Sequence, residues 1–101
     1  MEDKKCLIDR LRLLGSCDGI QSSSVEEVGG WIVVYGKFVN IDIECDAISF
    51  KNCNISNSEI KASGFKFSYS YVEGSNLHYG VKGISFINID NSTFRNTNII
   101  S

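Results

Sequence analysis

Bulky apolar residues recur at intervals of five over the second half of this chain. Two longer intervals of seven, from 65 to 72 and from 77 to 84, interrupt the series. An α-helix repeats its apolar face about every 3.6 residues and a strand every two, so neither explains this spacing. The pattern predicts a chain that turns a corner every five residues and points one large side chain inward from each short side. The ten positions are Phe50, Ile55, Ile60, Phe65, Val72, Leu77, Ile84, Ile89, Phe94 and Ile99.

The residues between these positions suit such corners. Seven of the ten residues that stand two positions before an apolar one are Ser, Thr or Cys, and asparagine fills many other sites. Short Ser and Asn side chains bond to nearby backbone, and Asn tolerates the left-handed conformation. The chain has no proline, which suits a stack whose amides must donate to the next layer. Four sides of five residues predict a coil of about 20 residues, with coils stacked about 4.8 Å apart.

This arrangement resembles the pentapeptide-repeat family, whose chains form a right-handed quadrilateral β-helix. The resemblance covers residues 48–101, and family repeats carry a small residue, often alanine, two positions before a central Leu or Phe. Here Ser replaces that alanine, Ile often replaces Leu, and Lys82 occupies one small-residue position. The resemblance implies a mainly β chain that forms a small parallel β-helix (β-solenoid) of about three coils. The two longer intervals leave a looser parallel β-helix or a small sheet as alternatives.

The N-terminal segment predicts a helix that caps this stack. Leu7, Leu11 and Leu14 recur with helical spacing within residues 1–15. A repeat architecture needs such a cap because its terminal cross-section is hydrophobic. Residues 16–30 are polar and rich in Gly and Ser, which predicts a loop. With 101 residues in total, all of these segments are expected to belong to one domain.

Residues 31–47 predict the leading strands, with a break at Gly36. Beyond this break, apolar and polar residues alternate with the period of two that is typical of a strand with one buried face. The polar face carries Asp42, Glu44 and Asp46, which lie about 6.8 Å apart at successive positions.

Such a carboxylate row repels itself unless water, salt or a cationic partner compensates. A solvated strand face is the simplest interpretation. The row could also hold a hard cation, meet a basic surface, or act as acid and base, as in large β-helix polysaccharide lyases and hydrolases. Three coils give a stack only roughly 15 Å high, which is short for the groove that a sugar-cleaving site needs. Among the functional interpretations we therefore expect contact with a partner.

Aromatic residues form a second candidate contact surface. Phe67, Tyr69 and Tyr71 share one face if this segment is extended, and His78 and Tyr79 follow shortly after. Outward aromatic clusters are typical of protein-binding hot spots, although the rings could instead pack on one another along the stack. His78 is the single histidine and lacks the partners of a catalytic triad, so we expect no catalytic residues.

The four cysteines predict neither a metal site nor a disulfide framework. No C-x-x-C spacing occurs among Cys6, Cys17, Cys45 and Cys53. We expect these side chains to be buried as small apolar groups, and we expect no metal or cofactor.

Charge argues against nucleic acid as a partner. The net charge is -2, so no basic field attracts phosphates. No apolar run approaches the roughly 20 residues of a membrane span, and the N-terminus lacks the pattern of a signal peptide. We therefore expect a cytoplasmic protein that has no membrane partner.

These observations predict a non-catalytic protein–protein interaction module. Small size, lack of a catalytic set and a composition rich in Asn, Ile, Lys, Phe and Tyr favour a small inhibitor that binds and blocks a partner protein. It would act as a toxin immunity protein or as a phage anti-defence protein. The alternatives are a carbohydrate-active or metal-assisted enzyme that uses the carboxylate row, or a DNA-mimic inhibitor of the pentapeptide-repeat type. DNA mimicry is the weaker of these, because residues 48–101 hold three acids and five bases.

The residues expected to contact the partner come from both candidate surfaces: Asp42, Glu44, Asp46, Phe67, Tyr69, Tyr71, His78 and Tyr79. The last coil, which ends in Ile99 and Ile100, has no helix or charged cap after it in the sequence. We expect a second copy, forming a homodimer through the C-terminal coil, or the partner to cover this edge.

Overall fold

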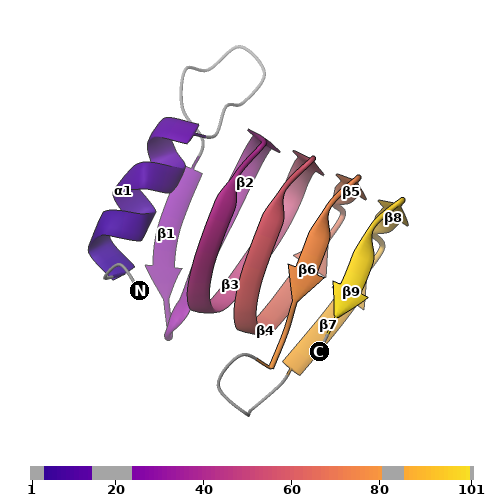
Figure 1. Ribbon diagram of the computed structural model, residues 1–101. Coiled ribbons are helices and arrows are strands. Elements are labelled where there is room, and N and C mark those ends of the chain that lie inside the picture. The colour runs from indigo at the N-terminus through magenta and orange to yellow at the C-terminus, as the bar shows by residue number, and fades with distance from the viewer. Residues whose placement is uncertain (1–3, 15–23, 81–85, 101) are drawn as a thin grey trace.

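The computed structural model describes residues 4–14, 24–80 and 86–100 and shows a mainly β chain with one helix among them (Figure 1). The helix is α1 (Lys4–Leu14). The strands are β1 (Ser24–Val28), β2 (Trp31–Val39), β3 (Asp42–Ser56), β4 (Glu59–Ser68), β5 (Tyr71–Glu73), β6 (Asn76–His78), β7 (Phe86–Asp90), β8 (Thr93–Arg95) and β9 (Asn98–Ile100).

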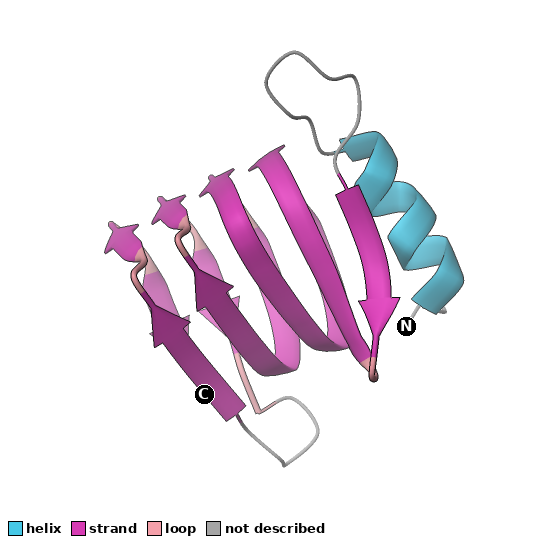
Figure 2. Cartoon of the chain, turned by 180° about the vertical axis from the view of Figure 1, so that it is seen from behind, coloured by secondary structure: helices cyan, strands magenta, loops and turns pink. Residues whose placement is uncertain are grey.

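These strands form one mostly parallel sheet. Its main path runs β1-β2-β3-β4-β6-β9, while β5 pairs with β3 and β8, and β7 pairs with β4. Only β1 and β2 pair antiparallel within the described chain. The path ends at β1 and β9, so this sheet is not closed (Figure 2).

Parallel pairing of β3 with β4 and β5, and of β4 with β6, aligns residues that are 17 positions apart, rather than the predicted 20. Ile43 aligns with Ile60, and Ile60 with Leu77. The next partner of Leu77 is Ile99, which is 22 positions further along the chain. We call each segment that brings the backbone back beside an earlier strand a return. The returns from Ile43 to Ile60 and from Ile60 to Leu77 span 17 residues, and the last return spans 22.

The return is shorter than predicted because it contains three intervals between inward-pointing residues instead of four, and these are seven, five and five residues long. Val72 follows Phe67 by five residues and Leu77 follows Val72 by five, but Phe67 follows Ile60 by seven. The longer interval arises because Phe65 and Phe67 both point inward on β4, where both are buried. A seven-residue step in the sequence is therefore a longer segment that contributes two core side chains.

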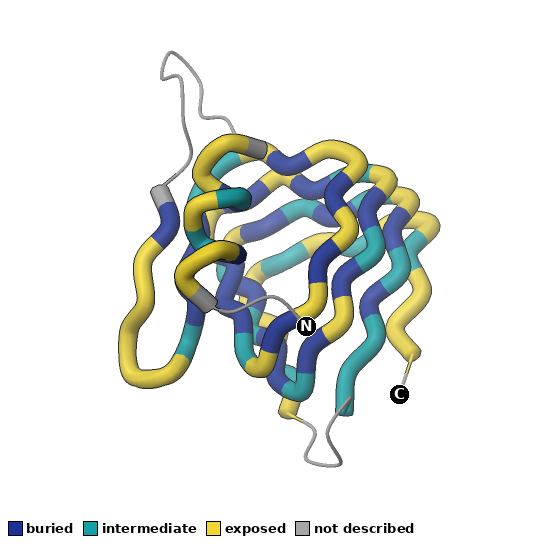
Figure 3. Tube along the Cα trace, turned by 60° about the vertical axis from the view of Figure 1, so that its left-hand side comes forward, coloured by how far each residue is buried: buried dark blue, intermediate teal, exposed yellow. Residues whose placement is uncertain are grey.

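Buried positions line up from one return to the next (Figure 3), and apolar residues occupy most of them. Six of the ten predicted apolar positions are completely buried: Phe50, Ile55, Ile60, Phe65, Val72 and Leu77. Phe94 is partly buried, whereas Ile89 and Ile99 are 44% and 41% exposed, which corrects the expectation of a dry column throughout. They are exposed because no described strand packs beyond β7, β8 and β9. Ile84 lies outside the described residues.

The predicted capping helix is confirmed over Lys4–Leu14. Leu7 and Leu11 are buried against the N-terminal edge of the sheet, where α1 contacts β1 and β2. Arg12 Nη2 donates to Val25 O at 2.8 Å, which ties the helix to β1. Helix α1 is therefore held in place by the packing of Leu7 and Leu11 and by the hydrogen bond from the Arg12 side chain to the backbone of β1.

Two local predictions in the N-terminal half were wrong. The predicted loop over 16–30 contains β1, because Gly29 and Gly30 adopt φ values of 57° and 86° and close a tight hairpin with β2. The predicted break at Gly36 does not end a strand either. β2 continues through Gly36, where its pairing with β3 shifts register.

Burial agrees with the cysteine prediction at two positions. Cys45 and Cys53 are buried, Cys6 is exposed, and Cys17 lies outside the described residues.

The helix α1 has 11 residues, and nowhere in the described ranges is there a helix of the length and apolarity needed to cross a membrane.

Candidate functional site

Left-handed backbone corners position the polar side chains of the sheet. Asn57 has a φ of 50° and is followed by the buried Ser58. The Ser58 hydroxyl donates to Ser56 O at 2.9 Å and accepts from the backbone amide of Ile41 at 3.1 Å. Ser75 Oγ accepts from Ser58 N in the same way, at 3.1 Å. Each of these hydroxyls joins one return to the next, so the corners are held in a fixed stack.

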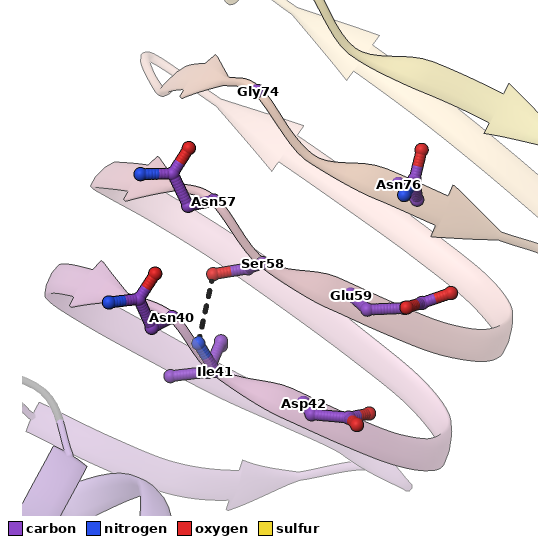
Figure 4. Close-up of a pocket in the computed structure, with 8 residues that line it drawn as sticks. All are labelled: Asn40, Ile41, Asp42, Asn57, Ser58, Glu59, Gly74 and Asn76. Carbon is purple, nitrogen blue, oxygen red and sulfur yellow. Dashed lines mark hydrogen bonds between the residues drawn. The ribbon is translucent and has the colours of Figure 1, made fainter.

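A hollow of about 350 Å³ lies over this stack of corners (Figure 4). Figure 4 shows Asn57 above Asn40 and Glu59 above Asp42, in parallel columns. A Cβ at Gly74 would lie 2.8 Å from Asn57 Oδ1, so glycine leaves room for that amide. The lining residues are Asn40, Ile41, Asp42, Asn57, Ser58, Glu59, Gly74 and Asn76.

The carboxylate row lies beside this hollow on the outward side of β3. Register aligns Asp42 with Glu59 and Asn76, and it aligns Glu44 with Lys61 and His78. We call these six residues, Asp42, Glu44, Glu59, Lys61, Asn76 and His78, the acidic face. It combines three carboxylates with one lysine and one imidazole at strand spacing.

A hydrogen bond between side chains of β6 and β4 crosses the acidic face. His78 Nε2 lies 2.9 Å from Glu59 Oε1, and the two side chains are 29% and 45% exposed. Asn98 Nδ2 donates to Asn76 Oδ1 at 2.9 Å and extends the polar ladder onto β9. The nearby Ser58 and Ser75 hydroxyls are buried and bonded to backbone. The face therefore offers charge and hydrogen-bonding groups to a partner surface, and these serines are committed to the fold.

The structure places the predicted carboxylates as the alternation indicated. Asp42, Glu44 and Asp46 are exposed, whereas Ile43 and Cys45 between them are buried. His78 joins Asp42 and Glu44 on one face although it is more than 30 positions away in sequence.

The predicted aromatic surface is only partly present. Phe67 is 1% exposed and stacks on Phe50 with ring centroids 5.2 Å apart, so the expectation that it faces outward was wrong. The alternation fails because Tyr69 sits at a corner with a φ of 50°. Tyr69 is 64% exposed and Tyr71 is half-buried on β5, while Tyr79 packs partly against the core.

Comparison with known proteins identifies no relative of this chain. The chain matches no family model, no curated protein and no solved structure.

Sequence reasoning missed Glu59, Lys61 and Asn76 as members of the acidic face. Their positions relative to the carboxylate row are set by the 17-residue return, as in Asp42 and Glu59. Polar residues that recur at 17 positions are the signal that points to them, and the five-residue interval does not contain this signal. Among the described residues, no three His, Cys, Asp or Glu side chains are placed to hold a metal ion.

Proposed function

We propose that this chain is a non-catalytic protein–protein interaction module, a small cytoplasmic inhibitor that binds and blocks a partner protein. A toxin immunity protein and a phage anti-defence protein are the two settings that fit this role. The observation that carries the proposal is the backbone conformation and exposure of Tyr69.

Tyr69 occupies a position that favours asparagine. It adopts a φ of 50°, as do Asn52 and Asn91, which precede and follow it at the equivalent corners of adjacent returns. Asn tolerates this left-handed conformation, whereas the same conformation costs a tyrosine about 1 kcal/mol more than an asparagine. The Tyr69 side chain is 64% exposed, so burial does not offset that cost. A strained and exposed aromatic residue is best explained by contact with a partner.

The surroundings of Tyr69 suit a protein surface. Tyr71 lies two residues further on, and register places it between Asn54 and Thr93. Tyrosine on a background of Asn, Ser and Thr is the composition of antibody combining sites, where rigid rings supply area and short polar groups adapt. The hydroxyl of Ser70 accepts from Cys53 N at 3.2 Å and fixes this corner to its neighbour. Such preorganisation lowers the entropy cost of binding.

The fold that supports this role is, we propose, a β-solenoid of about three coils. The 17-residue returns and the corner hydrogen bonds at Ser58 and Ser70 support it. Two five-residue intervals within each 17-residue return support a divergent relationship to the pentapeptide-repeat family, and the seven-residue interval is a departure from it. The acidic face supplies a second surface, which would suit a basic region of the partner.

The test uses two substitutions at equivalent corners. We expect Tyr69→Asn to raise the melting temperature by about 4–8 °C, because relief of about 1 kcal/mol has that effect in a domain of this size. The same variant should lose affinity for the partner, identified as a stoichiometric co-purifying protein and measured by calorimetry. Asn52→Tyr, the matched control for the backbone conformation, should lower the melting temperature. Unchanged affinity for Tyr69→Asn, or no gain in stability, would contradict the proposal.

A further inference from the structure

The indole ring of Trp31 lies across the outward side of the sheet. It starts from β2 and reaches Gly64 on β4, which is two strands away in the sheet. A Cβ at Gly64 would be 3.1 Å from Cη2 of the indole, so glycine leaves the space in which the ring lies. Phe86, the register partner of Gly64 on β7, contacts the indole edge to face, with ring centroids 5.9 Å apart. Strands that are distant in sequence therefore build one aromatic surface.

Two lysine side chains lie beside these rings. Lys66 Nζ is 4.4 Å from the centroid of the Trp31 ring, which is a cation–π contact. Register pairs Lys66 with Ser49, and Lys51 follows Ser49 by two residues, so both lysines lie on the same side of the sheet. In the described parts of the chain, neither ammonium group has a carboxylate partner, and the Trp31 indole N–H has no acceptor. We call Trp31, Phe86, Lys51 and Lys66 the aromatic platform.

Carboxylates lie around the aromatic platform rather than within it. Glu26 is on β1, Asp46 comes directly before the segment of β3 that crosses the platform, and Asp90 is at the end of β7. The Asp90 carboxylate accepts from Asn91 Nδ2 at 2.9 Å. Among the described residues, none of these carboxylates pairs with a platform lysine. The centre of the platform therefore presents unpaired positive charge next to aromatic rings.

We propose that the aromatic platform binds an acidic segment of another protein. An apolar side chain of that segment packs on Trp31 and Phe86, and a neighbouring carboxylate accepts from Lys66. The ammonium group has three donors, so it can bond a carboxylate while it stays close to the indole. Aromatic rings beside a cation are typical of residues that dominate protein–protein binding.

The shape of the platform favours a protein over a small molecule. Small ligands bind in concave sites that enclose most of their surface. The hollow over the corners is lined by other residues, and so is a hollow of about 490 Å³ beside α1. The platform lies on the outward side of β2, β3, β4 and β7, and Phe86 is 47% exposed there. An extended segment of a partner can cover such a face.

The experiment uses the full chain, whose single tryptophan is Trp31, so that tryptophan fluorescence reports on the platform directly. The probe is the blocked peptide acetyl-Asp-Leu-Asp-Leu-Asp-amide, and the control probe has Asn in place of each Asp. We expect the acidic peptide to change the Trp31 emission with a saturable titration. The Asn peptide should bind about 10-fold or more weakly, because hydrogen bonds between charged groups are stronger than neutral ones.

Substitutions then separate the lysine from the general charge of the chain. Lys66→Met keeps an apolar side chain over the indole and should weaken binding of the acidic peptide by about 10-fold. Lys61→Met is the matched control, because Lys61 is an exposed lysine on the acidic face, and it should leave binding unchanged. Gly64→Ala should also weaken binding, since its Cβ displaces the indole. Circular dichroism checks that each variant is folded.

Three results would overturn this inference: no response of Trp31 to the acidic peptide, equal affinity for the two peptides, or equal loss in Lys66→Met and Lys61→Met. Tighter binding of an oligothymidylate would also overturn it and indicate single-stranded nucleic acid as the occupant. Self-association that sedimentation velocity shows to be lost in Lys66→Met would instead indicate the acidic face of a second copy.

The inference goes beyond the proposed inhibitor role and does not depend on it. The Tyr69→Asn test measures affinity for the co-purifying partner, whereas the titrations of Trp31 need only the synthetic peptides. Failure of one proposal can therefore be distinguished from failure of the other.

Discussion

At the scale of single residues, the corner serines explain why this chain uses Ser where a simple apolar repeat would need only a small residue. Ser58, Ser70 and Ser75 are each at most 4% exposed. Each donates to a carbonyl two residues earlier, and each accepts an amide of the neighbouring return. Alanine would fit the space but would leave that amide without its acceptor.

We therefore expect Ser58→Ala to lower the free energy of unfolding by about 1–3 kcal/mol, the cost of a buried amide without a partner. Urea denaturation measures this change. Ser56→Ala is the control, because the Ser56 carbonyl that accepts from Ser58 Oγ is kept. Equal stability of the two variants would show that the Ser58 hydroxyl contributes little.

At the scale of elements, α1 shows how a short helix depends on tertiary packing. An isolated helix of 11 residues is marginal in water. Leu7 and Leu11 bury one face against the sheet, while Leu13 is 87% exposed on the other. The helix is therefore stabilised by the side chains that cover the sheet end.

This contrast gives a matched pair of substitutions in one element. Leu11→Ala should lower the free energy of unfolding by about 2–5 kcal/mol, because it removes a fully buried side chain from the helix that covers the sheet end. Leu13→Ala should change stability by less than about 0.5 kcal/mol, as is usual for exposed positions. Thermal unfolding of both variants measures the difference, and a similar loss for both would argue against the cap.

At the scale of the whole molecule, stability should fall from the capped end towards the open end. β3 and β4 pair with strands on both sides, whereas β7, β8 and β9 pair on one side only. Residues at the open end also bury less of their side chains, as Ile89 and Ile99 show.

Hydrogen exchange on the unsubstituted chain measures this gradient. Amides of β3 and β4 should exchange about 100-fold or more slowly than those of β8 and β9, because local opening is easiest where fewest contacts are lost. Uniform protection across all strands would contradict the gradient and indicate a single cooperative unit.

Elements whose cause is local could be predicted from the amino-acid sequence. Periodicity alone identified the helix at Leu7 and Leu11, the alternation at Asp42 and Glu44, and the six buried apolar positions from Phe50 to Leu77. The hairpin at Gly29 was missed because its two strands pair across a turn that composition alone marked as a loop. Local spacing cannot tell whether Phe67 continues an exposed face or enters the core.

Strand register could not be predicted in this way, because it is set by tertiary packing, and register determines which distant residues lie side by side. The 17-residue return places Glu59, Lys61 and His78 beside the carboxylate row, and it places Tyr69 in a column of asparagines. Register depends on whether a segment places one or two apolar side chains in the core, as β4 does with Phe65 and Phe67. The spacing between two apolar residues in the sequence does not show which of these cases applies. For the same reason, the open end at Ile89 and Ile99 is a property of the stack, since identical spacing yields buried residues one return earlier.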